Sequence, residues 1–253
     1  MSEAFNRDAL AQFADAGFVI VRGLLPEAAR ERMLAAAERD LAAAVQPLEY
    51  EADLQYPGAP PSRESPGGRT VRRLLQACAR DEAFRAAATA PAIAGRLRQL
   101  LGSQVALAQA HHNCVMTKQP QYSSQTLWHR DIRYWSYRRP ELVSAWFALG
   151  EEHADNGCLM VLPGTQRMEF EAGRLDAAQF LRPDLAENRP LLESKVDVEL
   201  APGDVLFFHC RLFHAAGSNR SERIKFSPVF TYRAQDNPPL PGSRSASLPD
   251  IYL

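Results

Sequence analysis

The sequence lacks the features that mark several protein classes. Its longest uncharged apolar run, residues 142–150, is far shorter than the ~18 residues of a membrane span. The first ten residues mix acidic and basic side chains without an apolar stretch, so we expect no secretory signal. The four cysteines are too few for a disulfide scaffold, and none are spaced as C-x-x-C. We therefore expect a reduced, cytoplasmic protein that does not bind membranes.

A charge imbalance is also missing. The 253 residues include 29 basic and 30 acidic side chains, a net charge of -1, which argues against a nucleic-acid partner bound by phosphate neutralisation. With 46% hydrophobic and 23% charged residues, the composition is that of an ordinary globular protein. A chain of this length can bury a sizeable core.

The first hundred residues carry mainly helical patterns. Asn6 is a typical helix cap and Gly17 a typical helix stop, while Pro91 and Gly102 interrupt and end a later helical run. We predict a helix at 6–13, a strand at 18–21, and helices at 27–45, 71–79 and 81–101. Between them, prolines and glycines crowd residues 47–68, which predicts either a disordered connection or a functional loop such as a lid.

From residue 105 onward, short apolar runs alternate with turn signals such as Asp155-Asn156-Gly157 and Pro202-Gly203-Asp204. We predict strands at 105–116, 127–131, 142–149, 158–162, 196–200, 205–209 and 225–232, with a helix or long loop at 168–187. Regularly spaced short strands are typical of a sandwich or barrel. The expected fold is one mainly β domain with flanking helices, a double-stranded β-helix (cupin-like jelly roll), with a helical flank at 1–102, a core at 103–233 and a tail at 234–253.

The clearest chemical signal is Trp128-His129-Arg130-Asp131. Residues i and i+2 of a strand share a face, so His129 and Asp131 are expected to project together. A second histidine from a distant strand would complete the two-histidine-one-carboxylate triad of non-haem Fe(II) oxygenases. Alone, H-x-D is a weak pattern, because a surface ion pair or a hydrogen-bonded strand pair also explains it.

Two histidines compete for the distal position. His214 follows an apolar strand and precedes a polar turn, and we favour it. His209 lies five residues earlier and faces the site only if the strand continues without a bulge. His111 or His112 can face the site, although a satisfied strand histidine is the simpler interpretation, and His153 is expected to be solvated.

Two ordered blocks resemble the phytanoyl-CoA dioxygenase family. The W-H-x-D motif is followed at 155–166 by D-N-G-C-L-M-V-L-P-G-T-Q, which is similar to the family pattern E/D-N-G-C-L-x-V-x-P-G-[ST]-H. Residues 201–223 are similar to the pattern A-G-D-x-x-F-F-H…H-x-x-G-x-N-x-S, and residues 17–25 also fit. Several motifs in the right order are more specific than any single motif, and this resemblance spans most of the chain.

The resemblance implies a jelly roll that uses Fe(II), 2-oxoglutarate and O2. It implies hydroxylation, or another oxidation, of an unactivated C–H bond in a small organic substrate, with release of succinate and CO2. Carried over residue by residue, the iron ligands and catalytic residues are His129, Asp131 and His214. Residues that line the 2-oxoglutarate pocket are Asn113, Met116 and Lys118.

Two positions depart from the family pattern. Gln166 replaces a histidine that is not a ligand, so we expect a local effect. Lys225 replaces the arginine that grips the distal carboxylate of 2-oxoglutarate, and Ser227 shares its strand face. An ammonium can replace the guanidinium as a point charge, without the bidentate fork. The alternatives are a solvated Lys225, or a grip supplied by Arg223 or Arg233.

A basic and aromatic segment follows the metal motif. It contains Arg130, Arg133, Arg138 and Arg139, with Tyr134, Trp135 and Tyr137 between them. Such a rim can recognise an anionic organic substrate, and a solvated loop is the alternative. The substrate wall is expected in the loops at 47–68 and 168–190. Cys158 and Cys210 are interpreted as small buried hydrophobes.

Two other functions stay open at this point. A cupin-like metalloenzyme could use the same three ligands without 2-oxoglutarate. A non-catalytic jelly-roll binding module is the second, although an intact triad has no purpose there. Succinate formation in the presence of iron would favour the oxygenase over the metalloenzyme without 2-oxoglutarate. Metal analysis of the purified protein would distinguish both enzymes from the binding module.

Overall fold

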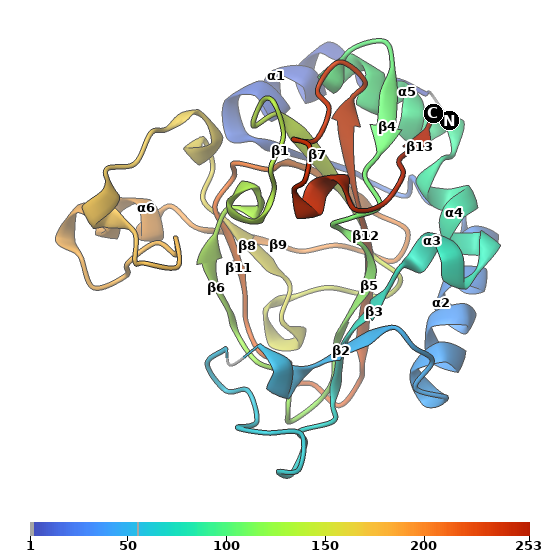
Figure 1. The fold of residues 1–253 in the computed structure, drawn as a ribbon, viewed down its shortest axis with the longest axis vertical. Helices are drawn as coiled ribbons and strands as arrows, with labels where there is room; N and C mark the ends of the chain where they lie inside the picture. The colour runs from blue at the N-terminus through green and yellow to red at the C-terminus, as the bar shows by residue number, and fades with distance from the viewer. Residues whose placement is uncertain (1–2, 55) are drawn as a thin grey trace.

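The computed structural model describes residues 3–54 and 56–253, so Met1, Ser2 and Gln55 of the predicted segments lie outside the described residues. Two antiparallel sheets face each other, and most helices cover the outside of the larger sheet (Figure 1). The α-helices are α1 (Arg7–Ala16), α2 (Glu27–Ala42), α3 (Ala77–Arg80), α4 (Glu82–Ala88), α5 (Pro91–Leu101) and α6 (Arg189–Glu193). Short 3-10 helices are η1 (Glu51–Asp53), η2 (Asp131–Tyr134), η3 (Ala154–Asn156), η4 (Thr165–Arg167), η5 (Ala172–Arg174), η6 (Ala186–Asn188) and η7 (Arg244–Ala246).

The larger sheet runs in the order β1-β10-β7-β12-β5-β3-β2. In addition, β4 pairs with β12 and with β13, so both β4 and β13 belong to this sheet. The smaller sheet runs β6-β11-β8-β9. The strands are β1 (Phe18–Val21), β2 (Leu48–Tyr50), β3 (Val71–Leu75), β4 (Val105–Leu107), β5 (Asn113–Lys118), β6 (Thr126–His129), β7 (Leu142–Phe147), β8 (Leu159–Val161), β9 (Val196–Val198), β10 (Val205–His209), β11 (His214–Ala216), β12 (Lys225–Ala234) and β13 (Ile251–Tyr252). The predicted mainly β jelly roll with flanking helices is therefore confirmed.

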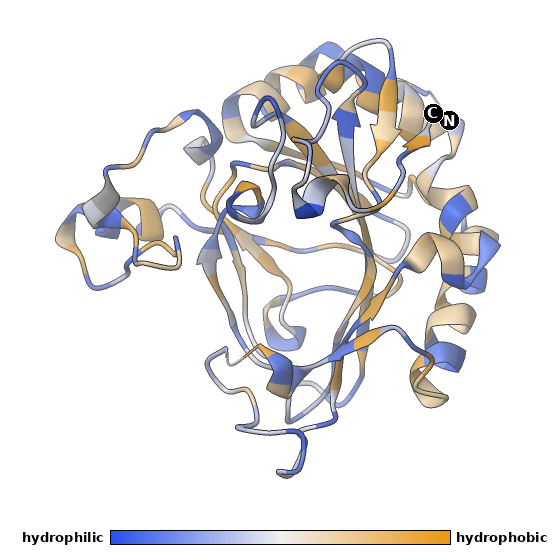
Figure 2. Ribbon diagram, viewed as in Figure 1, coloured by the Kyte–Doolittle hydropathy of each residue, from blue (hydrophilic) through white to orange (hydrophobic). Residues whose placement is uncertain are grey.

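The central strands are buried on both faces, which produces two core layers. On the helix side of β12, Phe226, Phe230 and Tyr232 pack with the buried faces of the N-terminal helices. On the other side, Val229 packs with side chains of the smaller sheet, among them Leu159. Figure 2 shows hydrophobic colour along the central strands and more hydrophilic colour on the loops outside them. Burying a polar side chain between the sheets costs free energy unless a hydrogen bond or an ion pair compensates for it. Polar side chains in this space therefore call for an explanation.

The first helix forms as its end signals predict. The Asn6 side chain accepts a hydrogen bond of 2.8 Å from the Ala9 N–H, and Gly17 ends the helix in the left-handed region at φ 83°. The Gly17 N–H then bonds to the carbonyl of Phe13. This short helix delivers the chain directly into β1, which pairs with β10.

Two predicted elements differ most from the structure. Residues 71–79 were expected to form a helix, but β3 occupies the first part because Arg73 and Leu74 pair with Met116 and Val115 of β5. The helix α3 begins only at Ala77. The predicted single strand at 105–116 is divided into β4 and β5, since Thr231 bonds to Ala108 and to His112 and the residues between them loop out.

Candidate metal centre and cosubstrate pocket

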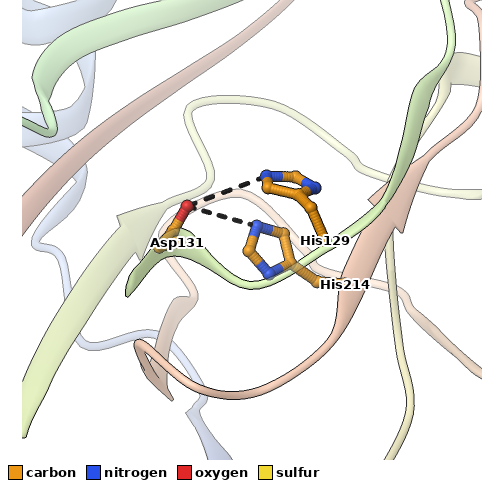
Figure 3. Close-up of side chains that lie close together, drawn as sticks. All are labelled: His129, Asp131 and His214. Atoms are coloured by element: carbon orange, nitrogen blue, oxygen red, sulfur yellow. Dashed lines mark ion pairs between the residues drawn. The ribbon is translucent and has the colours of Figure 1, made fainter. Parts of the chain in front are cut away.

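Three ligand-type side chains meet between the sheets. His129 ends β6, Asp131 opens η2, and His214 begins β11. Figure 3 shows both imidazoles pointing toward the Asp131 carboxylate, and Asp131 Oδ1 lies 3.8 Å from His129 Nε2 and 3.6 Å from His214 Nε2. One ligand atom from each residue lies within 4.8 Å of the others, and all three side chains are buried. Asp131 lies just past the end of β6, so a turn, and not the predicted strand alternation, aims its carboxylate.

Backbone hydrogen bonds fix which nitrogen of each imidazole faces the centre. His129 Nδ1 lies 2.8 Å from the Leu127 carbonyl, and His214 Nδ1 lies 3.1 Å from the Leu212 carbonyl. A carbonyl only accepts, so each Nδ1 carries the proton and each Nε2 presents its lone pair. Burial, with a smaller effect of His214, lowers the pKa of His129 to about 3. The ring is therefore neutral at physiological pH, as a metal ligand must be.

The carboxylate of Asp131 supplies the charge of the site. Burial by itself would raise the pKa of Asp131, but His112, His214 and His129 outweigh it, so the pKa is lowered and the group is ionised. Its Oδ2 is buried and has no hydrogen-bond partner among the residues that the structure describes. Two neutral imidazole nitrogens, one carboxylate and an unsatisfied buried oxygen fit a divalent iron that keeps open positions.

Of the other histidines, one reaches this centre. His112 Nδ1 lies 3.5 Å from Asp131 Oδ2, in the looped segment between β4 and β5. Burial lowers its pKa to about 4. The interpretation of His112 as a satisfied strand histidine is thus wrong, while His111 does bond to Ser245 Oγ at 2.6 Å. His209 ends β10 in the larger sheet and packs near Phe13, away from the three-residue centre.

A cavity of about 40 Å³ extends from the two imidazoles into the space between the sheets. Its walls combine apolar side chains with four cations. The lining residues are Arg72, Arg73, His112, Met116, Thr117, Lys118, Thr126, His129, Trp146, Leu159, Phe208, His214, Ala216 and Lys225. Buried cations beside a metal-ligand cluster are typical of a site for an anionic ligand.

Three of the five predicted cosubstrate residues line this cavity: Met116, Lys118 and Lys225. Ser227 lies behind Lys225, with its Oγ 3.2 Å from Lys225 Nζ. Asn113 does not line the cavity, and its side chain accepts a hydrogen bond of 2.9 Å from the Cys78 N–H in α3. Its position on β5 directs it toward a helix and not toward the cavity.

The alternative cations do not reach the cavity wall. Arg233 forms an ion pair of 2.5 Å with Asp250, and Arg223 is exposed in the turn before β12. The departure at Gln166 has the local effect expected of it. Its side-chain amide donates to the carbonyls of Ala14 and Asp15 at 3.0 and 3.3 Å and fastens the end of α1.

Aromatic side chains lie beside the ring of His129. Phe180 and Tyr134 lie edge-on to its ring, with centroids 6.1 and 6.2 Å away. The Tyr56 hydroxyl lies 3.3 Å from that of Tyr134, and the ring of Tyr56 lies 6.1 Å from that of Phe180. Tyr56 and Phe180 belong to the two loops predicted to form the substrate wall. Both loops therefore approach the metal centre.

Only part of the predicted basic rim lies near this wall. The Arg133 guanidinium stacks over Phe180 at 3.8 Å and over Tyr134 at 4.5 Å. Arg139 forms ion pairs with Glu141 and Asp236 at the surface. The interpretation of Trp135 and Tyr137 as rim residues is wrong, since both are buried in a cluster that includes Cys210. All four cysteines, Cys158 and Cys210 included, are free and buried, as expected.

Comparison with known proteins agrees with this geometry. The model of the family "Phytanoyl-CoA dioxygenase (PhyH)" matches residues 13–227, most of the chain. The chain belongs to the phytanoyl-CoA dioxygenase family. The resemblance noted in the sequence is therefore confirmed, and the matched region contains all three ligand-type residues.

The family relatives are distant and longer. Human peroxisomal phytanoyl-CoA dioxygenase is 25% identical over 224 residues, 84% of this chain and 64% of that protein. Ectoine dioxygenase of Halomonas elongata is 26% identical over 190 residues, 68% of this chain and 56% of that protein. A probable phytanoyl-CoA dioxygenase of Caenorhabditis elegans is 29% identical over 147 residues, 53% of this chain and 46% of that protein. The chain thus spans about half to two thirds of the length of these curated relatives.

Solved structures share the fold. EctD from S. alaskensis with 2-oxoglutarate and 5-hydroxyectoine has a TM-score of 0.77 at 21% identity, covering 93% of this chain and 78% of that chain. The epimerase SnoN in complex with Fe3+, alpha ketoglutarate and nogalamycin RO has a TM-score of 0.73 at 21% identity, covering 96% and 93%. At this level of identity the likeness concerns the fold.

Sequence reasoning missed several residues of the cavity region, among them two arginines, a tryptophan and a glutamate. Arg72 and Arg73 fell in a segment expected to be helical, and their placement in β3 turns them toward the cavity. Trp146 and Glu152 were not singled out, and the indole Nε1 donates to both Glu152 oxygens at 3.0 and 3.2 Å. No signal in the sequence links Glu152 to Lys225, and only the fold brings the two side chains together.

Proposed function

We propose that this protein is an Fe(II)- and 2-oxoglutarate-dependent oxygenase that hydroxylates, or otherwise oxidises, an unactivated C–H bond of a small organic molecule. The observation that carries the proposal is the buried His129–Asp131–His214 cluster at the mouth of a cation-lined cavity. Iron with 2-oxoglutarate supplies the oxidising power, consuming O2 and releasing succinate and CO2 as the substrate is hydroxylated. The residues of the chain would bind the iron and the cosubstrate, orient them, and shield the reaction from water.

His129, Asp131 and His214 are the proposed iron ligands. The backbone carbonyls that fix both Nδ1–H groups hold the rings ready for the metal, so little ordering is needed on binding. Asp131 contributes one negative charge in a buried place, which favours a dication. His112 lies beside Asp131 Oδ2 and is placed to hold the carboxylate in position.

The cavity beyond the imidazoles is the proposed 2-oxoglutarate site. Lys118 and Lys225 supply donors in its wall, Ser227 accepts a hydrogen bond from Lys225 and holds it from behind, and Met116 forms part of the wall. Tyr56 and Phe180 cover the centre from outside, and they would limit the access of water during oxidation.

For the substrate we propose a small anionic organic molecule. Arg133 supports this choice, because its guanidinium lies among the aromatic side chains beside His129, and its Nη1 is buried without a hydrogen-bond partner among the described residues. An unpartnered guanidinium nitrogen is a ready donor for a carboxylate or phosphate. No helix within the described residues is long and apolar enough to cross a membrane. The four free, buried cysteines support a reducing compartment such as the cytoplasm.

The test is turnover of 2-oxoglutarate by the purified chain with Fe(II) and O2, followed as succinate formation, since many oxygenases consume cosubstrate slowly without substrate. We expect succinate in the wild-type protein and none in Asp131→Ala. One observation favours the rival metalloenzyme without 2-oxoglutarate: Lys225 already has a carboxylate partner, Glu152, at 3.0 Å. Metal binding without any binding of 2-oxoglutarate would establish that rival.

A further inference from the structure

The four cations that line the cavity are not equivalent. Arg72 forms a buried ion pair of 3.0 Å with Glu51, and Arg73 lies 3.4 Å from Glu49. Lys225 lies 3.0 Å from Glu152. Lys118 is different: its Nζ donates to the Ser124 carbonyl at 2.8 Å, and none of the carboxylates described by the structure lies within ion-pair distance of it. Among the described residues, Lys118 is therefore the cavity-lining base without a carboxylate partner.

Glu152 is fully engaged before any ligand binds. Its side chain is completely buried, and Ser227 Oγ donates to its Oε1 at 2.7 Å. The indole of Trp146 donates to both of its oxygens. Within this cluster Lys225 is a neutralised cation. Glu152 reduces the attraction that Lys225 can exert on a second carboxylate, because two anions sharing one ammonium repel each other.

The two cavity lysines lie directly opposite each other on paired strands. Lys225 of β12 is the register partner of Lys118 of β5. Like charges at directly opposed positions destabilise a sheet, and here both side chains are buried. Burial, with smaller effects of Arg72 and Lys225, lowers the pKa of Lys118 to about 7. The fold thus tolerates an arrangement that becomes favourable when an anion enters.

The use of lysine at both positions is unusual for this chain. It contains only three lysines, Lys118, Lys195 and Lys225, among 29 basic residues, so arginine serves nearly everywhere else. An arginine stays charged in any surroundings, whereas a buried lysine can release its proton when no anion is near. Lysine therefore suits a buried wall that is sometimes without its ligand.

This inference rests on the proposed 2-oxoglutarate site. We propose that Lys118 supplies the net positive charge that receives the distal carboxylate, while the Glu152 carboxylate balances the charge of Lys225 and Ser227 holds that pair in place, so that Lys225 orients the carboxylate without adding net charge. The charges then balance. A dication with Asp131 leaves one positive charge, Lys118 adds a second, and 2-oxoglutarate carries two negative charges.

The experiment measures 2-oxoglutarate binding by calorimetry to the full chain loaded with Mn(II), which removes turnover from the readout. Lys118→Met should weaken binding about ten- to a hundredfold, the loss of one charge-assisted contact. Lys195→Met, an exposed lysine, is the matched control and should bind as wild type. Lys118→Gln is a second variant of the same position and should behave as Lys118→Met does. Mn(II) affinity is measured for each variant to verify an intact centre.

A double-mutant cycle separates the two lysines. Lys225→Met should weaken binding because it leaves Glu152 unpaired, and Glu152→Gln should tighten it. The double variant Lys225→Met/Glu152→Gln removes a neutral pair and should bind within about threefold of wild type. If the double variant stays as weak as Lys225→Met, or if both Lys118 variants bind normally, Lys225 is the attracting cation and the inference fails. If wild type with Mn(II) does not bind 2-oxoglutarate at all, the proposed function itself fails.

Discussion

His214, the first residue of β11, is the direct register partner of His129, the last residue of β6. Their ring centroids lie 4.2 Å apart, and both rings line the cavity between the sheets. One strand pair thus brings together two ligand-type side chains that are 85 residues apart in the sequence. Any register slip between these strands would separate the imidazoles, so the sheet and the metal centre are built by the same contacts.

The first prediction concerns metal binding. His129→Ala, Asp131→Ala and His214→Ala should each lower Mn(II) or Fe(II) affinity by a factor on the order of a hundred or more, because each removes one of three ligands. Succinate formation should disappear with it. Metal titration monitored by calorimetry checks this, and circular dichroism should show a retained fold. His209→Ala is the control, and loss of metal in that variant with normal binding by His214→Ala would move the distal ligand to His209.

The second prediction concerns the stability of the free protein. The folded pKa of Lys118, about 7, lies below its unfolded value of about 10.4, so its burial is unfavourable below pH 7 and this cost is lost as pH rises toward 10. Lys118→Met should therefore raise the free energy of unfolding by about 1–3 kcal/mol at pH 6 and by less at pH 9. Urea unfolding measures both. Lys195→Met should change stability little at either pH, and an unstable Lys118→Met at pH 6 would contradict this account.

The third prediction is the pH dependence of cosubstrate affinity. The charged groups that act on Lys118 are Arg72 of β3, Lys225 of β12 and Glu51 of η1. A bound carboxylate raises the pKa of the Lys118 ammonium, so above pH 7 binding takes up a proton and affinity should fall by up to about tenfold per pH unit. Calorimetry with Mn(II) between pH 6.5 and 8.5, in two buffers of different ionisation enthalpy, measures the slope and the proton uptake. Lys118→Gln should show neither, and an equal slope in that variant would assign the proton elsewhere.

The fourth prediction concerns the loop at 47–68, whose start forms β2 and η1 and whose Tyr56 contacts Tyr134. We expect fast hydrogen exchange at residues 57–68 in the free protein, slowed when cosubstrate and substrate bind together, because the oxidation must be shielded from water. Tyr56→Phe removes the hydroxyl contact and should speed this exchange. If cosubstrate and substrate leave the hydrogen-exchange rate of these residues unchanged, the segment is only a connection between elements.

The fifth prediction concerns substrate recognition by Arg133. Arg133→Gln should raise the KM for an anionic substrate about ten- to a hundredfold while leaving 2-oxoglutarate affinity unchanged, since the guanidinium lies on the aromatic side of His129 and not in the cosubstrate cavity. Screening of small carboxylates and phosphates by succinate yield identifies the substrate to use. Arg138→Gln, at an exposed position of the same segment, is the control. Equal effects of both variants would indicate only a general loss of positive charge.

The sequence by itself determined the family, the fold class and the three ligand-type residues. The family and the three ligand-type residues rest on the resemblance of several ordered motifs, and the elements rest on local signals such as the turn before β10 and the Asn6 and Gly17 signals around α1. These local signals are read within a few residues, where helix capping and turn chemistry act. The free cysteines followed from composition alone.

Only the tertiary structure decided what surrounds those residues. Residues 71–75 became β3 because β5 was available to pair with them, which overrides a helical pattern and brings Arg72 and Arg73 to the cavity. The residues between Ala108 and His112 loop out because Thr231 bonds to both ends, and this brings His112 to Asp131. Glu152 meets Lys225 across 73 residues of sequence. Charge pairing of this kind depends on distance through space, and a sequence pattern carries no such distance.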